Sequence, residues 1–277
     1  GYTRYPGLRD FPEKSGNFPL AVYSPNGDGY EWQDGSFKRP AKENLMVYEM
    51  LFRDFTSEQC VETAMAKIPY LKQLGINAVE LMPFSEFDGN RSWGYNPTFY
   101  FAPDKYYGRP EMYKEFIDKC HAEGIAVIMD VVLNHVWGVH PWCKMYWDDA
   151  LRRQASNSPF FNVQAPHNFS VGNDWKQENE HVQHYFCDML KYWVSEYHID
   201  GYRFDLVKGL GNSDSYAGNY DGDRYNASRI ANMKRLADAV WSVAPDGYVI
   251  QEAFTSLQEE IELGNYWVMS WKNKNYS

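Results

Sequence analysis

Residues 199–205 read Ile-Asp-Gly-Tyr-Arg-Phe-Asp, and this short run carries information on both the fold and the chemistry. The run is typical of a buried strand that ends at Asp205. Alternate strand residues point to the same side, so Arg203 and Asp205 are expected to face one site. A neighbouring guanidinium keeps a carboxylate ionised, as a nucleophile at a sugar carbon must be. The same pattern also suits a structural Arg–Asp pair at a strand end.

The composition limits the classes of function. The chain has 277 residues, 44% hydrophobic and 17% aromatic, which fits one large domain or two small ones with a full core. The net charge of −10 argues against nucleic acid as a partner. No apolar run reaches membrane-spanning length, and the first residues lack a signal-peptide core. Localisation stays open, with a periplasmic or secreted location preferred. The four cysteines form no CxxC pair, so no zinc cluster is expected.

Apolar strand-like runs alternate with helical patterns after an irregular lead-in, residues 1–44, which has one short strand candidate at 20–23. The alternation predicts an α/β fold with a parallel sheet covered by helices. No glycine-rich nucleotide motif follows the first strand, and the long loops follow the strands, which favours a (β/α) barrel over an open sheet. Six strands can be counted, whereas a barrel has eight. The expected strands are 46–52, 78–82, 126–133, 201–204, 248–251 and 267–271; the expected helices are 57–74, interrupted at Pro69, then 109–123, 180–197, 226–243 and 257–263.

Polar residues occur in and directly after the apolar run at 126–133. Asp130 lies inside this strand, where a charge needs a partner, and Arg203 is the expected one. Asn134 and His135 follow at the carboxyl end of the strand. His135 suits either a hydrogen bond to a bound polar ligand or the capping of loop carbonyls, and the sequence leaves both open.

Glu252 also stands where an apolar strand ends, about one βα unit after Asp205. The two carboxyl groups are therefore expected at the same rim of the barrel. Glycoside cleavage needs two such groups, one ionised and one protonated. Arg203 favours ionisation of Asp205, whereas Ala253 and Phe254 offer Glu252 an apolar setting that suits a general acid. The alternative is that Glu252 is an ordinary solvated acid.

The long loop 84–109, after the second strand, carries Trp93, Tyr95 and Phe99. These side chains suit stacking against a sugar ring, and they equally suit packing within the loop. A separate segment, 219–223, faintly resembles a calcium loop but lacks the glycine and the terminal glutamate of an EF-hand at the required spacing. An EF-hand is therefore not expected.

Four segments taken together resemble the α-amylase family, which is family 13 of the glycoside hydrolases. All four agree with that family in order and spacing, and the resemblance runs from about Met46 to the end of the chain. It implies a (β/α)8 barrel over residues 45–277, with a small domain B inserted after the third strand at residues 136–178. The segments are Ser92-Trp-Gly-Tyr-Asn-Pro-Thr-Phe-Tyr, Asp130-Val-Val-Leu-Asn-His135, Gly201-Tyr-Arg-Phe-Asp-Leu-Val-Lys208 and Gln251-Glu-Ala-Phe254.

The resemblance implies a retaining glycoside hydrolase that acts on α-glucans such as starch, maltooligosaccharides and related α-1,4/α-1,6 glucans. Asp205 would be the nucleophile, Glu252 the general acid/base, and Arg203 the residue that positions Asp205. Tyr95 would stack beneath the reacting sugar, and His135 would bind its hydroxyl groups. The further substrate-binding candidates are Asp130, Lys208, Trp93 and Phe254.

The resemblance implies no cofactor for the chemistry, and calcium only as a structural ion. Asn134 matches a position that binds calcium in many members of the family. Gly209 stands where the family often has His, which puts the calcium site in doubt. The family's fourth region, a His-Asp pair near the seventh strand, has no counterpart before Ser277. The chain is therefore expected to be a fragment of about six βα units with little or no activity alone.

Two alternatives share these residues. A branching or cyclising transferase would use the same nucleophile and acid, and would differ in taking a sugar instead of water as the acceptor. A non-catalytic glucan-binding relative is the other alternative. Proteins of that kind tend to lose the catalytic carboxyl groups, and here Asp205 and Glu252 are both in place.

Overall fold

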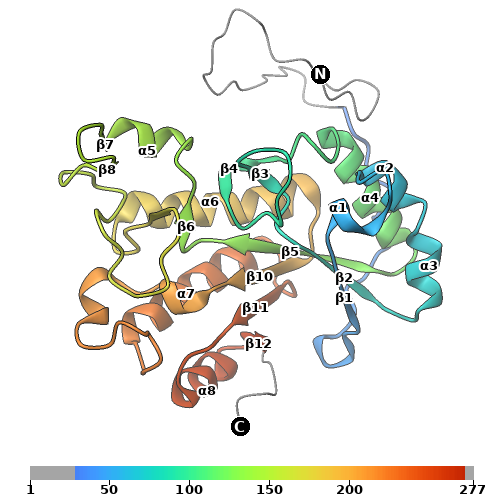
Figure 1. Cartoon of the computed structure of the whole chain (residues 1–277). Coiled ribbons are helices and arrows are strands. Elements are labelled where there is room, and N and C mark those ends of the chain that lie inside the picture. Colours follow the sequence, from blue (N-terminus) through green and yellow to red (C-terminus); the bar gives the residue numbers. More distant parts are fainter. Residues whose placement is uncertain (1–28, 272–277) are drawn as a thin grey trace, which may run out of the picture.

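A six-stranded parallel sheet, curled as a half-barrel, forms the framework of the computed structural model, which describes residues 29–271 (Figure 1). The spatial order of the strands follows the chain, β1-β2-β5-β10-β11-β12. This order fits a barrel, because an open doubly wound sheet reverses its strand order. The six expected strands and the α/β class are confirmed. The strands are β1 (Val47–Met50), β2 (Ala78–Leu81), β5 (Ala126–Val132), β10 (Gly201–Asp205), β11 (Tyr248–Glu252) and β12 (Met269–Trp271).

Helices connect the strands and cover the outer, convex face of the sheet (Figure 1). The helical stretch expected over 57–74, with its interruption at Pro69, is two helices in the structure, and Pro69 lies in the first turn of the second one. A proline has no backbone N–H to donate, which is tolerated only near a helix start. The helices are α1 (Phe52–Phe55), α2 (Val61–Met65), α3 (Ile68–Gln73), α4 (Pro110–Ala122), α6 (Glu180–Tyr197), α7 (Ala227–Trp241) and α8 (Leu257–Asn265), with α5 (Pro141–Met145) in the insertion.

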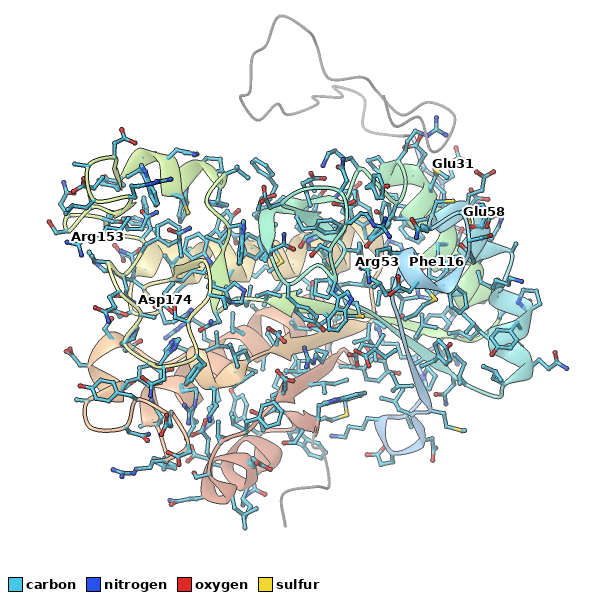
Figure 2. All side chains as sticks on the ribbon, in the orientation of Figure 1. Glu31, Arg53, Glu58, Phe116, Arg153 and Asp174 are labelled. Carbon is cyan, nitrogen blue, oxygen red and sulfur yellow. The ribbon has the colours of Figure 1, made fainter. Side chains whose placement is uncertain are left out.

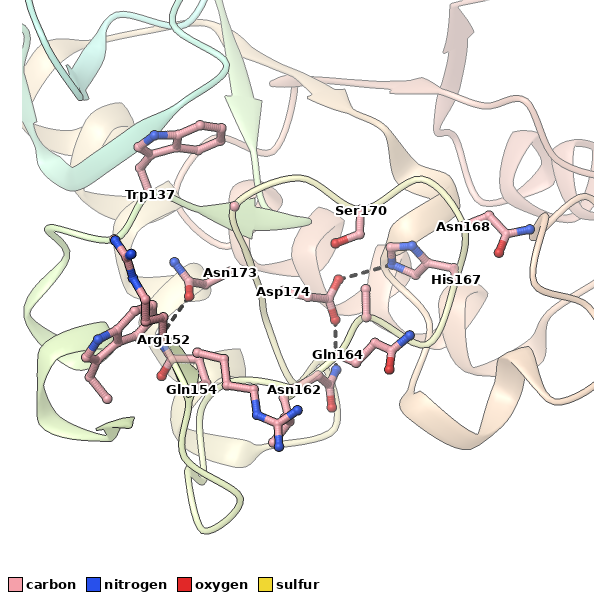
Figure 3. Close-up of a pocket in the computed structure, with 16 residues that line it drawn as sticks. Trp137, Arg152, Gln154, Asn162, Gln164, His167, Asn168, Ser170, Asn173 and Asp174 are labelled. Atoms are coloured by element: carbon pink, nitrogen blue, oxygen red, sulfur yellow. Dashed lines mark hydrogen bonds and ion pairs between the residues drawn. The ribbon is translucent and has the colours of Figure 1, made fainter. Parts of the chain in front are cut away.

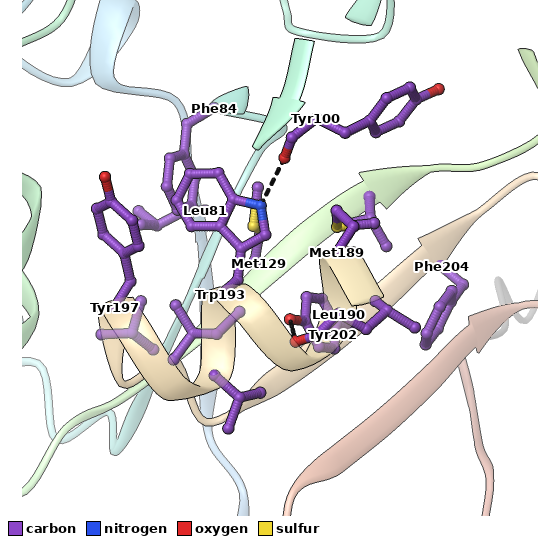
Figure 4. Packing of buried hydrophobic residues seen from close by; sticks show 14 of the residues in the cluster. Leu81, Phe84, Tyr100, Met129, Met189, Leu190, Trp193, Tyr197, Tyr202 and Phe204 are labelled. Carbon is purple, nitrogen blue, oxygen red and sulfur yellow. Dashed lines mark hydrogen bonds between the residues drawn. The ribbon is translucent and has the colours of Figure 1, made fainter. Parts of the chain in front are cut away.

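The main core lies between the outer face of the sheet and these helices (Figure 4). Trp193 of α6 is fully buried there, and its ring meets Phe84 edge-on at a centroid distance of 5.2 Å. Its indole N–H donates to the carbonyl of Tyr100 at 2.7 Å, so the one polar atom of the ring is satisfied. Truncating a buried tryptophan of this kind costs about 3–5 kcal/mol. This packing fixes α6, and with it the start of β10.

The expected loop 84–109 contains a hairpin instead, made of β3 (Ser85–Phe87) and β4 (Pro97–Pro103). The pairing is irregular, with two register shifts, so no clean alternation marks it in the sequence. Between the strands, Gly94 has a φ of +95°, and a Cβ there would lie 1.9 Å from the carbonyl oxygen of Pro83. Only glycine fits this position, which sets the direction of the loop that carries Tyr95.

The segment 136–178 forms a small lobe beside the carboxyl ends of the strands (Figure 1). Figure 2 shows Arg153 and Asp174 in this lobe, far from Phe116 of α4. Its assignment as a separate domain B stays a prediction. The lobe's strands are β6 (His135–Val136), β7 (Trp147–Asp148), β8 (Arg153–Gln154) and β9 (Asn173–Asp174), where β6 pairs with β9 and β7 pairs with β8.

Residues 29–44, which we call the strap, run across the amino ends of the strands. Asp34 accepts hydrogen bonds from His121 at 2.9 Å and from His198 at 2.8 Å. Arg39 forms ion pairs with Asp200 at 2.8 Å and with Asp246. The strap is therefore irregular, as expected, but firmly attached. The strand candidate at 20–23 lies outside the described residues. None of the helices between residues 29 and 271 is long and apolar enough to span a membrane.

Candidate active site

Three neighbouring strands bring ionisable side chains to the inner, carboxyl-end rim of the half-barrel. Arg203 on β10 is paired in register with Asp130 on β5 and with Ile250 on β11. Residues two apart on a strand face the same side, so Asp205 and Glu252 lie one step nearer the rim than Arg203. The expectation that both carboxyl groups come from adjacent strands at one rim is met.

One guanidinium links all of these acids. The Nη1 atom of Arg203 lies 2.9 Å from an oxygen of Asp130 and 2.8 Å from an oxygen of Asp205. Its Nη2 atom lies 2.7 Å from Glu252 Oε1. The other oxygen of Glu252 accepts a hydrogen bond from the backbone N–H of Leu206 at 3.0 Å. Both carboxyl groups proposed for the chemistry are thus held in place by the same side chain.

The electrostatics of this cluster differ from the simple expectation of an ionised Asp205. Burial raises the pKa of Asp205 to about 6, because Arg203 offsets only part of the desolvation and Glu252 adds repulsion. Burial alone would lower the pKa of Arg203, but the carboxylates of Asp130 and Glu252 outweigh it and raise that pKa. Asp205 is therefore mainly ionised at neutral pH and becomes protonated in mildly acidic solution.

Glu252 has a different environment from the apolar one expected. Of the two apolar neighbours in sequence, Phe254 is 45% exposed, whereas Ala253 is buried. The cation that contacts it, Arg203, comes from the adjacent strand. This contact depends on the register between β10 and β11, which the sequence does not display.

Tyr95 connects the hairpin loop to the cluster. Its hydroxyl donates to Asp130 at 2.7 Å, and its backbone carbonyl accepts from Nε2 of His135 at 2.9 Å. His135 is only 3% exposed, and burial lowers its pKa, so the neutral form prevails. The geometry is that of a histidine satisfying a loop carbonyl. The predicted hydrogen bonds from His135 to a sugar stay a prediction.

Asn134 is the residue on which the calcium expectation rests. Its Nδ2 lies 3.1 Å from Nδ1 of His135, and its buried Oδ1 has no hydrogen-bond partner. A Cβ at position 209 would lie 1.7 Å from that oxygen, which explains why Gly209 is glycine here. Calcium takes six to eight oxygen ligands, and this position supplies one unpaired side-chain oxygen. Among residues 29–271, no group of three or more His, Cys, Asp or Glu could hold a metal ion. The calcium expectation stays a prediction.

The remaining candidates are Trp93, Phe254 and Lys208. Trp93, on the hairpin loop, is 59% exposed, and Phe254, after β11, is also on the surface. The ammonium of Lys208 lies 5.5 Å from the ring of Phe169, and its carbonyl accepts a hydrogen bond from Arg229. Substrate contacts from these three candidates stay predictions.

One acid near the cluster was missed by the sequence reasoning. Glu80 on β2 is 1% exposed, and its Oε2 atom has no hydrogen-bond partner. Burial raises its pKa to about 7, partly offset by Arg203 and reinforced by Glu49 and Glu252. The signal was present in the sequence, because Glu80 interrupts an apolar strand just as Asp130 does.

Known proteins share this arrangement of strands and segments. The family model described as the catalytic domain of alpha amylase matches residues 61–177 and 167–270. Malto-oligosyltrehalose trehalohydrolase of Saccharolobus solfataricus is 31% identical over 203 residues, which is 69% of this chain and 34% of that protein. The 1,4-alpha-glucan branching enzyme GlgB of Vibrio parahaemolyticus is 31% identical over 267 residues, or 90% and 32% of the two chains. The structure of Eubacterium rectale Amy13B matches with a TM-score of 0.68 at 21% identity, over 90% of this chain and 53% of that one, which supports the fold alone. This chain thus spans about a third of the length of these two curated relatives.

Proposed function

Because this chain belongs to the α-amylase family, we propose that it carries the catalytic centre of a retaining glycosidase acting on α-glucans. The observation that supports this most is the pair of carboxyl groups held by Arg203, with Asp205 on Nη1 and Glu252 on Nη2. Groups bound to neighbouring nitrogens of one guanidinium lie close together. This favours the short carboxyl separation of retaining enzymes, about 5–5.5 Å, over the about 6.5–9.5 Å of inverting ones.

In the proposed first step, the carboxylate of Asp205 attacks the anomeric carbon, and Glu252 donates its proton to the leaving glycosidic oxygen. The bond to the leaving sugar breaks as the ester to Asp205 forms. In the second step, Glu252 takes a proton from water, whose oxygen attacks the same carbon and releases Asp205. Arg203 orients Asp205 throughout.

A pair of substrates with different leaving groups tests these roles. Fluoride leaves α-glucosyl fluoride without needing a proton, whereas a maltooligosaccharide needs one. The assay uses a protein with the length of the curated relatives, because this 277-residue chain is expected to have little activity alone. We expect Asp205→Asn to abolish reaction with both substrates. Glu252→Gln should lose reaction with the oligosaccharide far more than the first step with the fluoride. Equal loss of both reactions in Glu252→Gln would contradict its role as the acid, and unchanged reaction in Asp205→Asn would contradict the role of Asp205 as the nucleophile. A wild-type protein that binds the maltooligosaccharide but reacts with neither substrate would favour a binding protein.

A transferase is the second candidate, favoured by the match of the branching enzyme to 90% of this chain. Hydrolysis and transfer share the first step and differ in the acceptor. Product analysis with added maltose separates them, because a transferase makes longer or branched products and a hydrolase makes shorter ones.

A further inference from the structure

Glu80 is a buried acid that the proposed chemistry does not use. It is 1% exposed, and its Oε2 atom has no hydrogen-bond partner among residues 29–271. The acid in the cavity of the lobe is different, because Asp174 accepts a hydrogen bond from Asn162 at 2.8 Å and lies 3.1 Å from His167 (Figure 3). A buried carboxyl group without a partner lowers stability, so stability alone does not account for an acid at position 80.

The strand register places Glu80 inside the half-barrel, just below the groups that contact Arg203. Ala78, two residues earlier on β2, and Ile128, the register partner of Glu80 on β5, both belong to the small apolar cluster of the inner face. Asp130 lies two residues after Ile128 on the same face and is the register partner of Arg203. Glu80 therefore lies one layer below Asp130, on the adjacent strand.

The guanidinium of Arg203 has a buried donor without a partner. Nη1 contacts Asp130 and Asp205, and Nη2 contacts Glu252, whereas the buried Nε atom has no hydrogen-bond partner within the described part of the chain. A guanidinium only donates hydrogen bonds, and a carboxylate only accepts them. The unpaired Nε of Arg203 and the unpaired Oε2 of Glu80 lie in adjoining layers of one interior, and they are complementary in charge and in hydrogen bonding.

Charge also connects Glu80 to these groups. Burial raises the pKa of Glu80 to about 7, and Arg203 offsets part of this effect. The carboxylates of Glu49 on β1 and Glu252 on β11 raise the same pKa further. In turn, burial is the largest cause of the raised pKa of Asp130 on β5, and the charge of Glu80 adds to it. Glu80 therefore changes from neutral to negative near neutral pH, close to the groups proposed for the chemistry.

We propose that Glu80 is a positioning residue of the catalytic centre, which acts through Arg203 and Glu252 and does not touch the substrate. Above neutral pH, its carboxylate offers an acceptor to Nε of Arg203, and its negative charge helps Glu252 to keep the proton that the leaving oxygen requires. A negative charge nearby favours the protonated form of a carboxyl group. The inference rests on the proposed function, because that function makes Glu252 the acid.

NMR spectroscopy of the 277-residue chain tests the link between Glu80 and Arg203 without any need for turnover. The Nε–H resonance of Arg203, assigned by its absence in Arg203→Lys, is followed from pH 5 to pH 9. We expect it to shift through about pH 7 in the wild type, and to lose this step in Glu80→Gln while keeping a step near pH 6 from Asp205. Glu49→Gln, which removes an exposed charge from β1, is the matched control and should keep both steps. An unchanged titration in Glu80→Gln would overturn the proposal.

The pH dependence of turnover tests the role of Glu80, in a protein with the length of the curated relatives. A maltooligosaccharide needs the proton of Glu252, whereas α-glucosyl fluoride does not. At pH 8.5, Glu80→Gln should lower kcat/KM for the oligosaccharide about tenfold more than for the fluoride, the scale of removing one charge near a buried acid. At pH 5.5 the ratio of the two values should match the wild type, because Glu80 is then uncharged. Glu80→Asp keeps the charge and should restore most of the ratio at pH 8.5.

The two experiments separate the role of Glu80 from the proposed function. An equal loss with both substrates in Glu80→Gln would show a structural effect alone and would overturn the proposal. An unchanged titration of Arg203 together with normal turnover would also overturn it, and would leave the proposed function standing. A wild-type protein that turns over neither substrate, while Glu80→Gln still loses the step of Arg203, would contradict the proposed function and support the link between the two residues.

Discussion

Arg203 carries a single positive charge and contacts the carboxyl groups of Asp130, Asp205 and Glu252. Three ionised acids around one cation leave an excess of negative charge, so the cluster favours retaining a proton. Glycoside cleavage requires that one carboxyl group be protonated while its neighbour is ionised. The shared guanidinium therefore suits a group of carboxyl groups that hold one proton between them, and the assignment of that proton to Glu252 is part of the proposed function.

The first prediction at this scale concerns the acid limb of activity. A nucleophile must be ionised, and burial raises the pKa of Asp205 to about 6. In a protein with the length of the curated relatives, we expect turnover of α-glucosyl fluoride to rise with pH through about 6, since this substrate needs no proton donor. A rate that does not change from pH 5 to pH 7 would show that the pKa of Asp205 is closer to its ordinary value of 3.8.

The second prediction concerns Glu80. Burial raises the pKa of its carboxyl group from 4.5 to about 7. A carboxyl group with a raised folded-state pKa stabilises the fold fully below pH 4.5, and this contribution is lost as pH rises through about 7. Glu80→Gln should therefore be more stable than the wild type above pH 7, by up to roughly 3 kcal/mol, with little difference below pH 4.5. Urea unfolding across this pH range measures it.

Glu49→Gln is the matched control, because Glu49 is the exposed partner of Glu80 in the register of β1 and β2. It should change the stability far less. An equal gain in both variants would mean that general negative charge, not the burial of Glu80, is responsible.

Much of the cluster could be predicted from sequence at the residue scale. A charged residue inside an apolar strand is easily recognised in a sequence. This signal identified Asp130, and the same signal is present at Glu80. The family resemblance supplied the roles of Asp205 and Glu252. The bond between Arg203 and Glu252 could not be predicted, because it joins two strands whose register is set by packing across the whole sheet.

At the scale of elements, α7 and α8 are joined by a fully buried ion pair. Arg229 and Glu259 are both 0% exposed, with their atoms 2.6 Å apart. Arg229 also donates to the carbonyls of Lys208, Gly222 and Arg224, so it holds the loop after β10 against both helices. This pair therefore supports the segment that directly follows Asp205.

Breaking this pair on one side should be strongly destabilising. Glu259→Gln leaves the buried guanidinium without its counter-ion, and we expect a loss of about 3–5 kcal/mol in the free energy of unfolding. Glu260→Gln, the next residue along α8, is the control and should cost much less. Denaturant titration provides the measurement, and a loss below about 1 kcal/mol in Glu259→Gln would contradict the account.

The observed helices and strands agree with those predicted from the sequence where the hydrophobic pattern is long. The helix expected at 180–197 has the observed bounds of α6, Glu180–Tyr197. Short elements with irregular pairing, such as β3 and β4, gave no periodic signal. The small strands of the lobe, two residues each, depend on contacts that a sequence pattern does not contain.

At the scale of the whole molecule, the strap attaches the amino-terminal part of the described chain to the strand starts. Burial alone would raise the pKa of Asp34, but His198 and His121 outweigh it and lower that pKa. Burial alone would lower the pKa of His121, but Asp200 and Asp34 outweigh it and raise that pKa. Arg39, Asp246 and Asp118 are the other charged groups that contact the strap or its partners.

The pH dependence of the strap's attachment follows from the pKa changes of Asp34 and His121. The lowered pKa of Asp34 gives stability that is present above pH 3.8 and lost as pH falls through its folded value. The raised pKa of His121 gives stability that is complete below pH 6.5 and lost as pH rises through its folded value. The strap is therefore held most tightly between about pH 4 and 6.5.

We expect Asp34→Asn to lower the free energy of unfolding by roughly 1.5–3 kcal/mol at pH 5.5, the scale of hydrogen bonds to charged groups, and by less at pH 8.5. Chemical denaturation at the two pH values measures both losses. A loss that is the same at both values would show that the histidines do not carry the effect.

The central claim is that Asp205 is the nucleophile of a retaining reaction. Incubation with a 5-fluoro-α-glucosyl fluoride tests it most directly, since this reagent forms the glycosyl ester faster than water removes it. Digestion and mass spectrometry then locate the added sugar. In a protein with the length of the curated relatives, the account predicts one sugar per chain, on Asp205, and none in Asp205→Asn. A label on any other residue, or a labelled Asp205→Asn variant, would contradict it.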